Sequence, residues 1–101
     1  MNELRGLGLT DYEEKTYVAL LRSGPVGATK ISEKSGIPRT KIYPTLKSLE
    51  KQGFVEMLKT RPMSFNAIEP RIAIWKYTKN LVREREESGA RAIEKLEKLK
   101  V

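Results

Sequence analysis

The chain of 101 residues is long enough for one small domain with a modest core. It has no cysteine and no histidine, which excludes disulfides, thiolate metal sites and the usual general base, so we expect no catalytic residue, metal, cofactor or enzymatic activity. The formal net charge is +7. The sequence shows no signal peptide and no apolar run that could cross a membrane, which predicts a cytoplasmic protein without a membrane partner.

The positive charge is concentrated in the middle of the chain. Residues 28–62 carry eight basic and three acidic side chains, a net charge of +5, whereas residues 1–27 carry −1 and residues 63–101 carry +3. Such clustering is typical of a protein that binds a phosphate backbone. The alternative is a lysine face that only keeps the protein soluble, and charge alone does not separate the two.

The first helix is predicted to follow Thr10, which forms a capping box with Glu13 three residues later. The helix ends at Gly24-Pro25, and its apolar face is expected to hold Tyr17, Leu20 and Leu21. A short lead-in before the helix is expected to cover the core with Leu4, Leu7 and Leu9.

Two further helices form the centre of the chain. The first covers residues 28–35, with Ala28 and Ile31 facing inward and Gly36 at its end. After the tight connection Gly36-Ile37-Pro38, the second runs from Arg39 to Gln52. Two short helices joined by so brief a glycine-containing turn are typical of a helix-turn-helix.

Pro44 lies inside the helix predicted for residues 39–52, although a proline in a helix interior costs about 3 kcal/mol. On a helical wheel Leu46 and Leu49 both lie within about 40° of Ile42, so these three residues form the apolar side of the helix. The opposite side carries Thr40, Pro44, Lys47 and Lys51. Pro44 is therefore expected near the helix start on the solvent side, where water or phosphate can bond the carbonyl that loses its partner.

After Gly53 the apolar period changes from about 3.6 residues to about 2. Residues 54–59 and 63–69 are predicted as two strands joined by a turn at residues 60–62, with Arg61 near the tip. Three helices followed by a basic hairpin form a winged helix-turn-helix. The predicted fold is mainly α with a small β-hairpin, and residues 1–69 are assigned to a DNA-binding domain.

Residues 70–101 are predicted to form one long helix that begins at Pro70. This helix is too long for so small a domain to bury, so its apolar stripe is expected to meet a second copy in a two-fold dimer. The predicted interface consists of Ile74, Leu81, Val82, Ile93, Leu96 and Leu99. The alternative is a helix that bends at Ser88-Gly89 and folds back over the domain. Trp75 and Tyr77 are assigned to core or interface rather than to a platform for single-stranded nucleic acid.

Several stretches together resemble the N-terminal winged-helix domain of the TrmB-like transcription regulators, a mainly archaeal family known for sugar-responsive control. The resemblance covers about residues 7–70 and rests on LGLTDYE, SGIPRTKIY, LKSLEKQGFVE and the RP before the second strand. Sugar-sensing members carry a large C-terminal ligand-binding domain, and because the chain ends after one helix a small-molecule effector is not supported. TrmB-like sequences more often have a polar residue at the position of Pro44. The pair Tyr43-Pro44 is instead similar to the sequence of PadR-like winged helices at this position.

In a winged helix the third helix enters the major groove and uses its first residues on base edges. The predicted base contacts are Arg39, Thr40, Tyr43 and Pro44, and the arginine fork suits guanine best. The alternative for Tyr43 is packing on the second helix. The predicted phosphate contacts are Thr29, Lys30, Lys41, Lys47, Lys59 and Arg61.

The sequence therefore predicts a homodimeric transcription regulator that binds double-stranded DNA sequence-specifically. About residues 38–52 are expected in the major groove, and the wing, about residues 54–68, is expected on the DNA backbone. Two alternatives stay open. One is a chromosomal protein that coats DNA without sequence preference, and the other is a winged-helix module that binds a protein of the transcription machinery.

Overall fold

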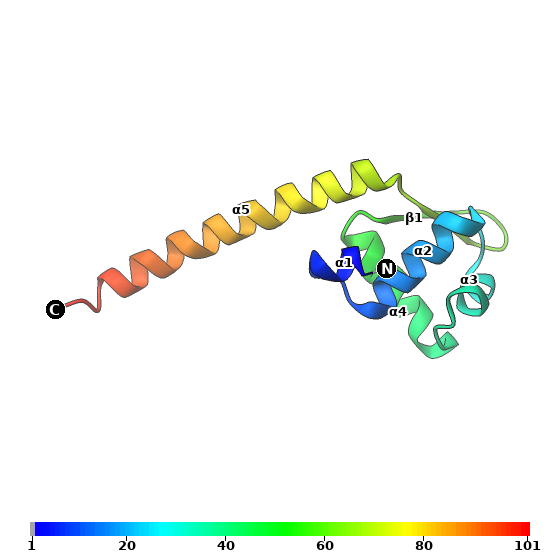
Figure 1. The fold of residues 1–101 in the computed structure, drawn as a ribbon, viewed down its shortest axis with the longest axis horizontal. Coiled ribbons are helices and arrows are strands. Elements are labelled where there is room, and N and C mark those ends of the chain that lie inside the picture. Colours follow the sequence, from blue (N-terminus) through cyan, green and yellow to red (C-terminus); the bar gives the residue numbers. More distant parts are fainter. Residues whose placement is uncertain (1) are drawn as a thin grey trace.

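The computed structural model describes residues 2–101. Four helices come first: α1 (Glu3–Gly6), α2 (Asp11–Ser23), α3 (Ala28–Ser35) and α4 (Arg39–Lys51). A hairpin of β1 (Val55–Leu58) and β2 (Ser64–Ala67) follows, and the chain ends with α5 (Pro70–Glu97). Helices α1–α4 and the hairpin form a head (residues 3–69), from which α5 extends as one rod, so that the molecule measures 61 × 27 × 25 Å (Figure 1). The predicted class, mainly α with a small hairpin and a long last helix, is confirmed.

Helix α2 starts as its sequence predicts. The hydroxyl of Thr10 accepts a hydrogen bond from the backbone N–H of Glu13 at 3.1 Å, and the Glu13 carboxylate accepts one from the N–H of Thr10 at 2.7 Å. Tyr17 and Leu20 are buried, but Leu21 is 45% exposed, so its predicted place in the core was wrong. Helix α1 covers the side of α2 that carries Glu14. Leu21 lies on the same side but about two turns farther along the helix, where α1 no longer covers it.

The core lies where α2, α3 and α4 meet the hairpin, and α1 closes one end of it with Leu4. An edge-to-face pair joins the rings of Tyr17 and Phe54 at 5.3 Å, and a second joins Phe54 to Tyr77 at 5.4 Å. Burial, with a smaller contribution from the Glu69 carboxylate, raises the pKa of Tyr17 to about 12. The Tyr17 hydroxyl therefore stays protonated, and it donates to the carbonyl of Ile68 at 2.6 Å.

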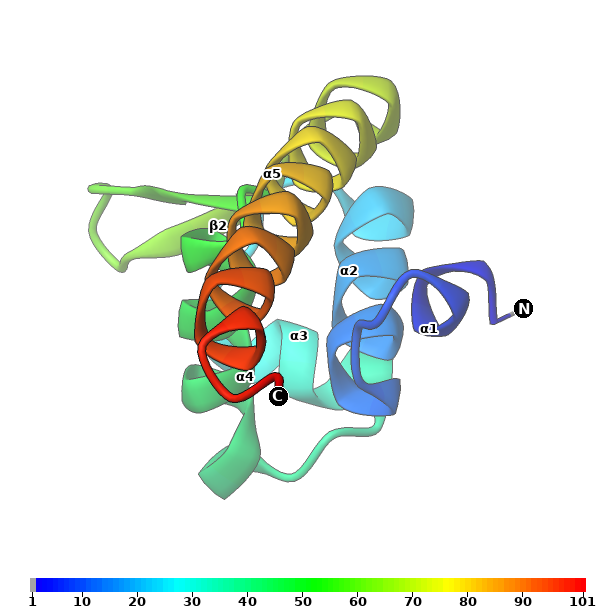
Figure 2. The same cartoon turned by 90° about the vertical axis from the view of Figure 1, so that its left-hand side faces the viewer.

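The hairpin is antiparallel, with Met57 opposite Phe65 in its register, and it projects sideways from the head (Figure 2). Val26, in the connection between α2 and α3, pairs with Phe65 on the other side of β2 as an isolated antiparallel bridge. Two backbone hydrogen bonds of 2.8 and 3.2 Å join the two residues. Both strands are shorter than predicted. Their outer residues continue as an irregular loop at residues 59–63, which carries the predicted tip residue Arg61.

Helix α5 begins at Pro70 and runs straight through Ser88 and Gly89, so the folded-back alternative was wrong (Figure 1). Its first turns rest on the head, where Ala73 is fully buried and the Tyr77 hydroxyl donates to the carbonyl of Leu7 at 3.0 Å. All residues from 82 to 101 are exposed. Neither α5 nor any other helix within residues 2–101 has the length and apolar character needed to span a membrane.

Candidate nucleic-acid interface

The turn between α3 and α4 is fixed by side chains as well as by backbone. Gly36 adopts a left-handed conformation with a φ of +74°, which glycine accepts without the steric cost that a Cβ brings. The Ser32 hydroxyl donates to the carbonyl of Ile37 at 2.6 Å, and the N–H of Ile37 donates to the hydroxyl of Ser35 at 3.2 Å. Ile37 is also buried. The course of the chain through the turn is therefore well defined.

Helix α4 exposes the side chains that the sequence assigned to DNA and buries those assigned to the core. Ile42, Leu46 and Leu49 are at most 1% exposed. Arg39 and Thr40 are exposed in the first turn, which contains no acidic residue. The first N–H groups of a helix have no partner within it and attract anions. The start of α4 therefore offers both side-chain and backbone donors to a nucleic acid.

Pro44 is exposed within an unbroken α4, as predicted. Pro44 leaves the carbonyl of Thr40 without its helical donor, and in the next position along the helix the hydroxyl of Thr45 donates to the carbonyl of Lys41 at 2.7 Å. Pro44 and Lys41 border a shallow surface groove whose other wall is the N-terminal end of α2. That wall includes Tyr12, 39% exposed, which the sequence analysis did not single out.

Tyr43 lies beside the hairpin, a contact that the sequence analysis did not predict. Its ring is 54% exposed and leans edge-on against Phe65 of β2, with 6.4 Å between the ring centroids. It therefore contacts the wing and connects α4 to the hairpin. The exposed part of the ring leaves the predicted base contact open.

The predicted phosphate contacts lie on three elements, and all are exposed: Thr29 and Lys30 on α3, Lys41 and Lys47 on α4, and Lys59 and Arg61 on the loop of the hairpin. Helices α3 and α4 are in contact, and α4 also contacts β1. Within residues 2–101 the ion pairs involve the basic residues Arg5, Lys15, Lys98 and Lys100. The basic side chains of residues 28–62 are thus not neutralised by carboxylates, and their charge is available to phosphates.

A buried carboxylate joins α2 to α4 behind this surface. Glu13 is 6% exposed and accepts hydrogen bonds from the hydroxyl of Ser48 and, at 2.6 Å, from the side-chain amide of Gln52. Burial on its own would raise the pKa of Glu13, but the bonds donated by Ser48, the Thr10 N–H and Gln52 together lower it below its ordinary value of 4.5. The ionised form is therefore the one that the folded protein prefers.

The lowered pKa makes stability depend on pH in a defined direction. Because the folded pKa lies below the unfolded one, the contribution of Glu13 is fully present above about pH 5 and is lost as the pH falls through the folded pKa. The free energy of unfolding is expected to decrease over this range, and the decrease is expected to be smaller in Glu13→Gln. Urea unfolding followed by circular dichroism between about pH 3.5 and 7 measures both curves. Identical pH slopes for the two proteins would contradict the assignment.

Comparison with known sequences agrees with this geometry. The family model for the sugar-specific transcriptional regulator TrmB matches residues 4–71. The chain is 38% identical over 82 residues to the HTH-type sugar sensing transcriptional regulator TrmBL1 of Pyrococcus furiosus, which covers 81% of this chain and 24% of the relative. It is 46% identical over 52 residues to the uncharacterized protein YrhO of Bacillus subtilis, covering 52% of this chain and 19% of that protein. The chain thus spans a quarter or less of the length of these relatives.

Solved structures show the same architecture. TrmBL2, described as an archaeal chromatin protein with a novel mode of DNA binding, aligns with a TM-score of 0.78 at 29% identity and covers 98% of this chain and 40% of its own. The transcriptional regulator Tm0710 of Thermotoga maritima aligns with a TM-score of 0.61 at 18% identity, covering 97% and 78%, and supports the fold alone. The predicted winged helix and its family resemblance are confirmed. The chain belongs to the TrmB family of transcriptional regulators, and it contains the winged-helix DNA-binding domain of that family.

Proposed function

We propose that this chain binds double-stranded DNA sequence-specifically as a homodimer and regulates transcription. In this proposal α4 enters the major groove and the hairpin contacts the DNA backbone. The observation that carries it is the N-terminal half of α4, where Arg39, Thr40 and Pro44 are exposed in a region whose basic side chains have no carboxylate partners. Membership of a family of transcriptional regulators supports the same assignment.

We place the end of the DNA-binding unit after Leu81 rather than after Glu69. Ala73 is fully buried in the head, and Ile74 and Tyr77 are half-buried against its core. A unit that stopped at residue 69 would expose this part of the core. The remainder, residues 82–101, makes no buried contact with the head and is assigned to dimerisation.

The exposed face of α5 supports the proposed dimer and changes its predicted interface. Ile74 packs on the head instead of facing outward, and Leu81 on the same side is half-buried. Trp75 is 59% exposed and lies on one line of the helix with Val82 and Leu96, at steps of seven and fourteen residues, which is the spacing of a coiled-coil seam. The proposed interface is therefore Trp75, Val82, Ile93, Leu96 and Leu99, all at least half exposed in the single chain.

Salt dependence of binding tests this function against its alternatives. Fluorescence anisotropy on a random duplex, and on a duplex that the protein itself enriches from a random pool, is measured from about 50 to 300 mM salt. A steep decrease in affinity with a strong preference for the enriched duplex supports a regulator. A steep decrease without preference supports a chromosomal coat, which the similarity to the chromatin protein TrmBL2 makes the second candidate. Weak binding that does not change with salt would support a protein-binding module.

Arg39 and Lys59 form a matched pair for separating base contacts from phosphate contacts, because both are exposed and both are basic. Arg39→Ala is expected to reduce the preference for the enriched duplex by about 1–3 kcal/mol, the value of one bidentate base contact. Lys59→Ala is expected to weaken binding to enriched and random duplexes equally. The same anisotropy titrations measure both. If Arg39→Ala also weakened both duplexes equally, its base-contact role would be wrong.

A further inference from the structure

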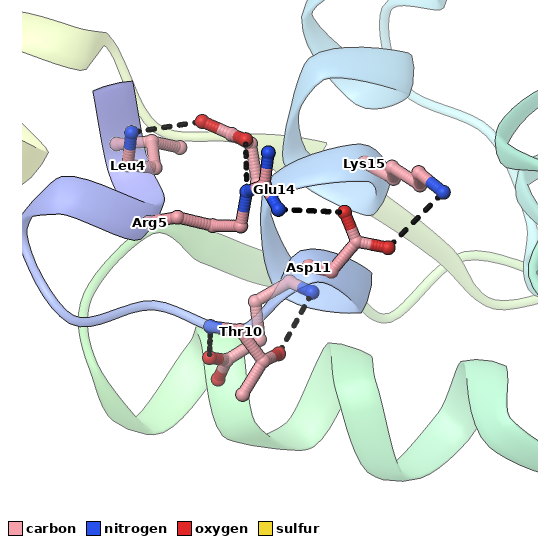
Figure 3. Close-up of polar contacts among 7 residues, drawn as sticks. Leu4, Arg5, Thr10, Asp11, Glu14 and Lys15 are labelled. Atoms are coloured by element: carbon pink, nitrogen blue, oxygen red, sulfur yellow. Dashed lines mark hydrogen bonds and ion pairs between the residues drawn. The ribbon is translucent and has the colours of Figure 1, made fainter. Parts of the chain in front are cut away.

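Two neighbouring carboxylates of α2 are buried but serve different partners. Glu13 is 6% exposed and Glu14 is 4% exposed. Glu14 turns toward α1, where it accepts a hydrogen bond from the backbone N–H of Leu4 at 2.8 Å and lies 3.5 Å from the Nε of Arg5 (Figure 3). Glu13 turns toward α4, whose Ser48 hydroxyl and Gln52 amide both donate to one of its oxygens.

We propose that Glu13 is a positioning residue that sets the pose of α4 on α2 and thereby the alignment of α4 with the bases of the major groove. This inference rests on the proposed DNA-binding function of α4. It assigns no direct DNA contact to Glu13, which acts through the helix that it holds.

The apolar contacts of α4 cannot fix its pose alone. Ile42, Leu46 and Leu49 bury the inner face of the helix, but hydrophobic burial is not directional and tolerates small shifts of the helix along α2. Hydrogen bonds to an ionised carboxylate are directional and roughly twice as strong as neutral ones. A shift of α4 that broke these bonds would leave a buried charge without two of its donors, which is costly. Glu13 therefore penalises displacements that the apolar core permits.

The bonds lie at the C-terminal half of α4, whereas the predicted base contacts lie at its start. Ser48 and Thr40 are eight residues apart, which corresponds to about 12 Å along a helix. A tilt of about 10° at Ser48 would thus move the first turn by about 2 Å, several times the tolerance of about 0.5 Å that a functional constellation allows. The helix is continuous between the two ends, and the bond from Thr45 to Lys41 spans the turn at Pro44.

The position of Gln52 adds to this arrangement. Besides its bond to Glu13, its amide lies 3.1 Å from the hydroxyl of Ser48 and 3.2 Å from the Ser48 carbonyl. The two donors are thus held together at the C-terminal end of α4, where Gln52 directly follows the helix. Such a connected group moves as one unit, so Glu13 restrains the helix rather than a single flexible side chain.

The test compares Glu13→Gln with Glu14→Gln, two neighbouring substitutions that each preserve size and remove one buried charge. Preference for the enriched duplex over a scrambled duplex is measured by anisotropy at a temperature where circular dichroism shows both variants folded. Glu13→Gln is expected to reduce this preference about tenfold, the weight of one direct base contact. Glu14→Gln is expected to change it less than about twofold. Equal losses in both variants, or no loss in Glu13→Gln, would overturn the proposal.

A measurement without DNA separates this inference from the proposed function. In hydrogen exchange, Glu13→Gln and the milder Gln52→Ala are expected to accelerate exchange in residues 43–52, while Glu14→Gln accelerates it in α1 and the start of α2. If the wild-type protein enriches no sequence, the proposed sequence-specific function fails, and the exchange pattern still decides the positioning role. Unchanged exchange across α4 in both Glu13→Gln and Gln52→Ala would refute it.

Discussion

Removal of residues 82–101 is expected to give a folded monomer whose affinity for a duplex with two half-sites is about 10²–10⁴-fold lower than that of the full chain. The factor is the gain from linking two binding modules so that the second binds as an intramolecular step. The deleted segment is exposed throughout and carries most of the proposed apolar seam, at Val82, Ile93, Leu96 and Leu99. The head keeps the turns of α5 that complete its core, including Ala73 and Tyr77.

Sedimentation equilibrium and anisotropy at one fixed salt concentration measure this result. Two further variants serve as controls. Leu96→Glu in the full chain is expected to reproduce the monomer by placing a charge in the seam. A cut after Glu69 is expected to unfold the head, because it removes Ala73 and Tyr77, which cover the core. A truncated protein that remained a dimer would show that α5 is not the dimerisation element.

Phe54→Ala is expected to lower the free energy of unfolding by about 3–5 kcal/mol. Phe54 is fully buried, and its ring makes edge contacts with Tyr17 of α2 and Tyr77 of α5. The substitution removes buried apolar area and two aromatic contacts. It also leaves a cavity where three segments meet, and these segments cannot all move in to close it. For a domain of this size such a loss is a large part of the total stability.

Urea unfolding followed by circular dichroism measures the change. Met57→Ala is the matched control, because Met57 lies three residues farther along in β1 but is 37% exposed, and its removal is expected to cost less than about 1 kcal/mol. Similar small losses in both variants would mean that the aromatic junction at Phe54 contributes little beyond ordinary surface packing.

Much of the fold follows from local signals in the sequence. The capping box of Thr10 and Glu13 and the left-handed Gly36 lie within a few residues of the helix ends that they define, and the structure confirms both. Leu21 shows where such signals stop. A helical period groups residues on one side of a helix, but it does not tell how far along the axis a neighbouring element covers that side.

The same limit applies to the candidate site. The exposed face of α4 was predictable, because the apolar period alone places Ile42, Leu46 and Leu49 inside and Thr40 and Pro44 outside. The bonds from Ser48 and Gln52 to Glu13 were not, since they join residues 35 and 39 positions apart. The contact of Tyr43 with Phe65 likewise depends on how the hairpin folds back beside α4.

The attachment of α5 to the head has a consequence for the DNA sites themselves. The Tyr77 hydroxyl bonds to the carbonyl of Leu7, and its ring lies against Phe54, so the helix leaves the head in one fixed direction. In the proposed dimer, the two heads therefore cannot swivel to follow DNA of a different helical phase. One added base pair between half-sites rotates the second by about 34° around the duplex. Operators of this protein are thus expected to share a single spacer length, even where their base sequences differ.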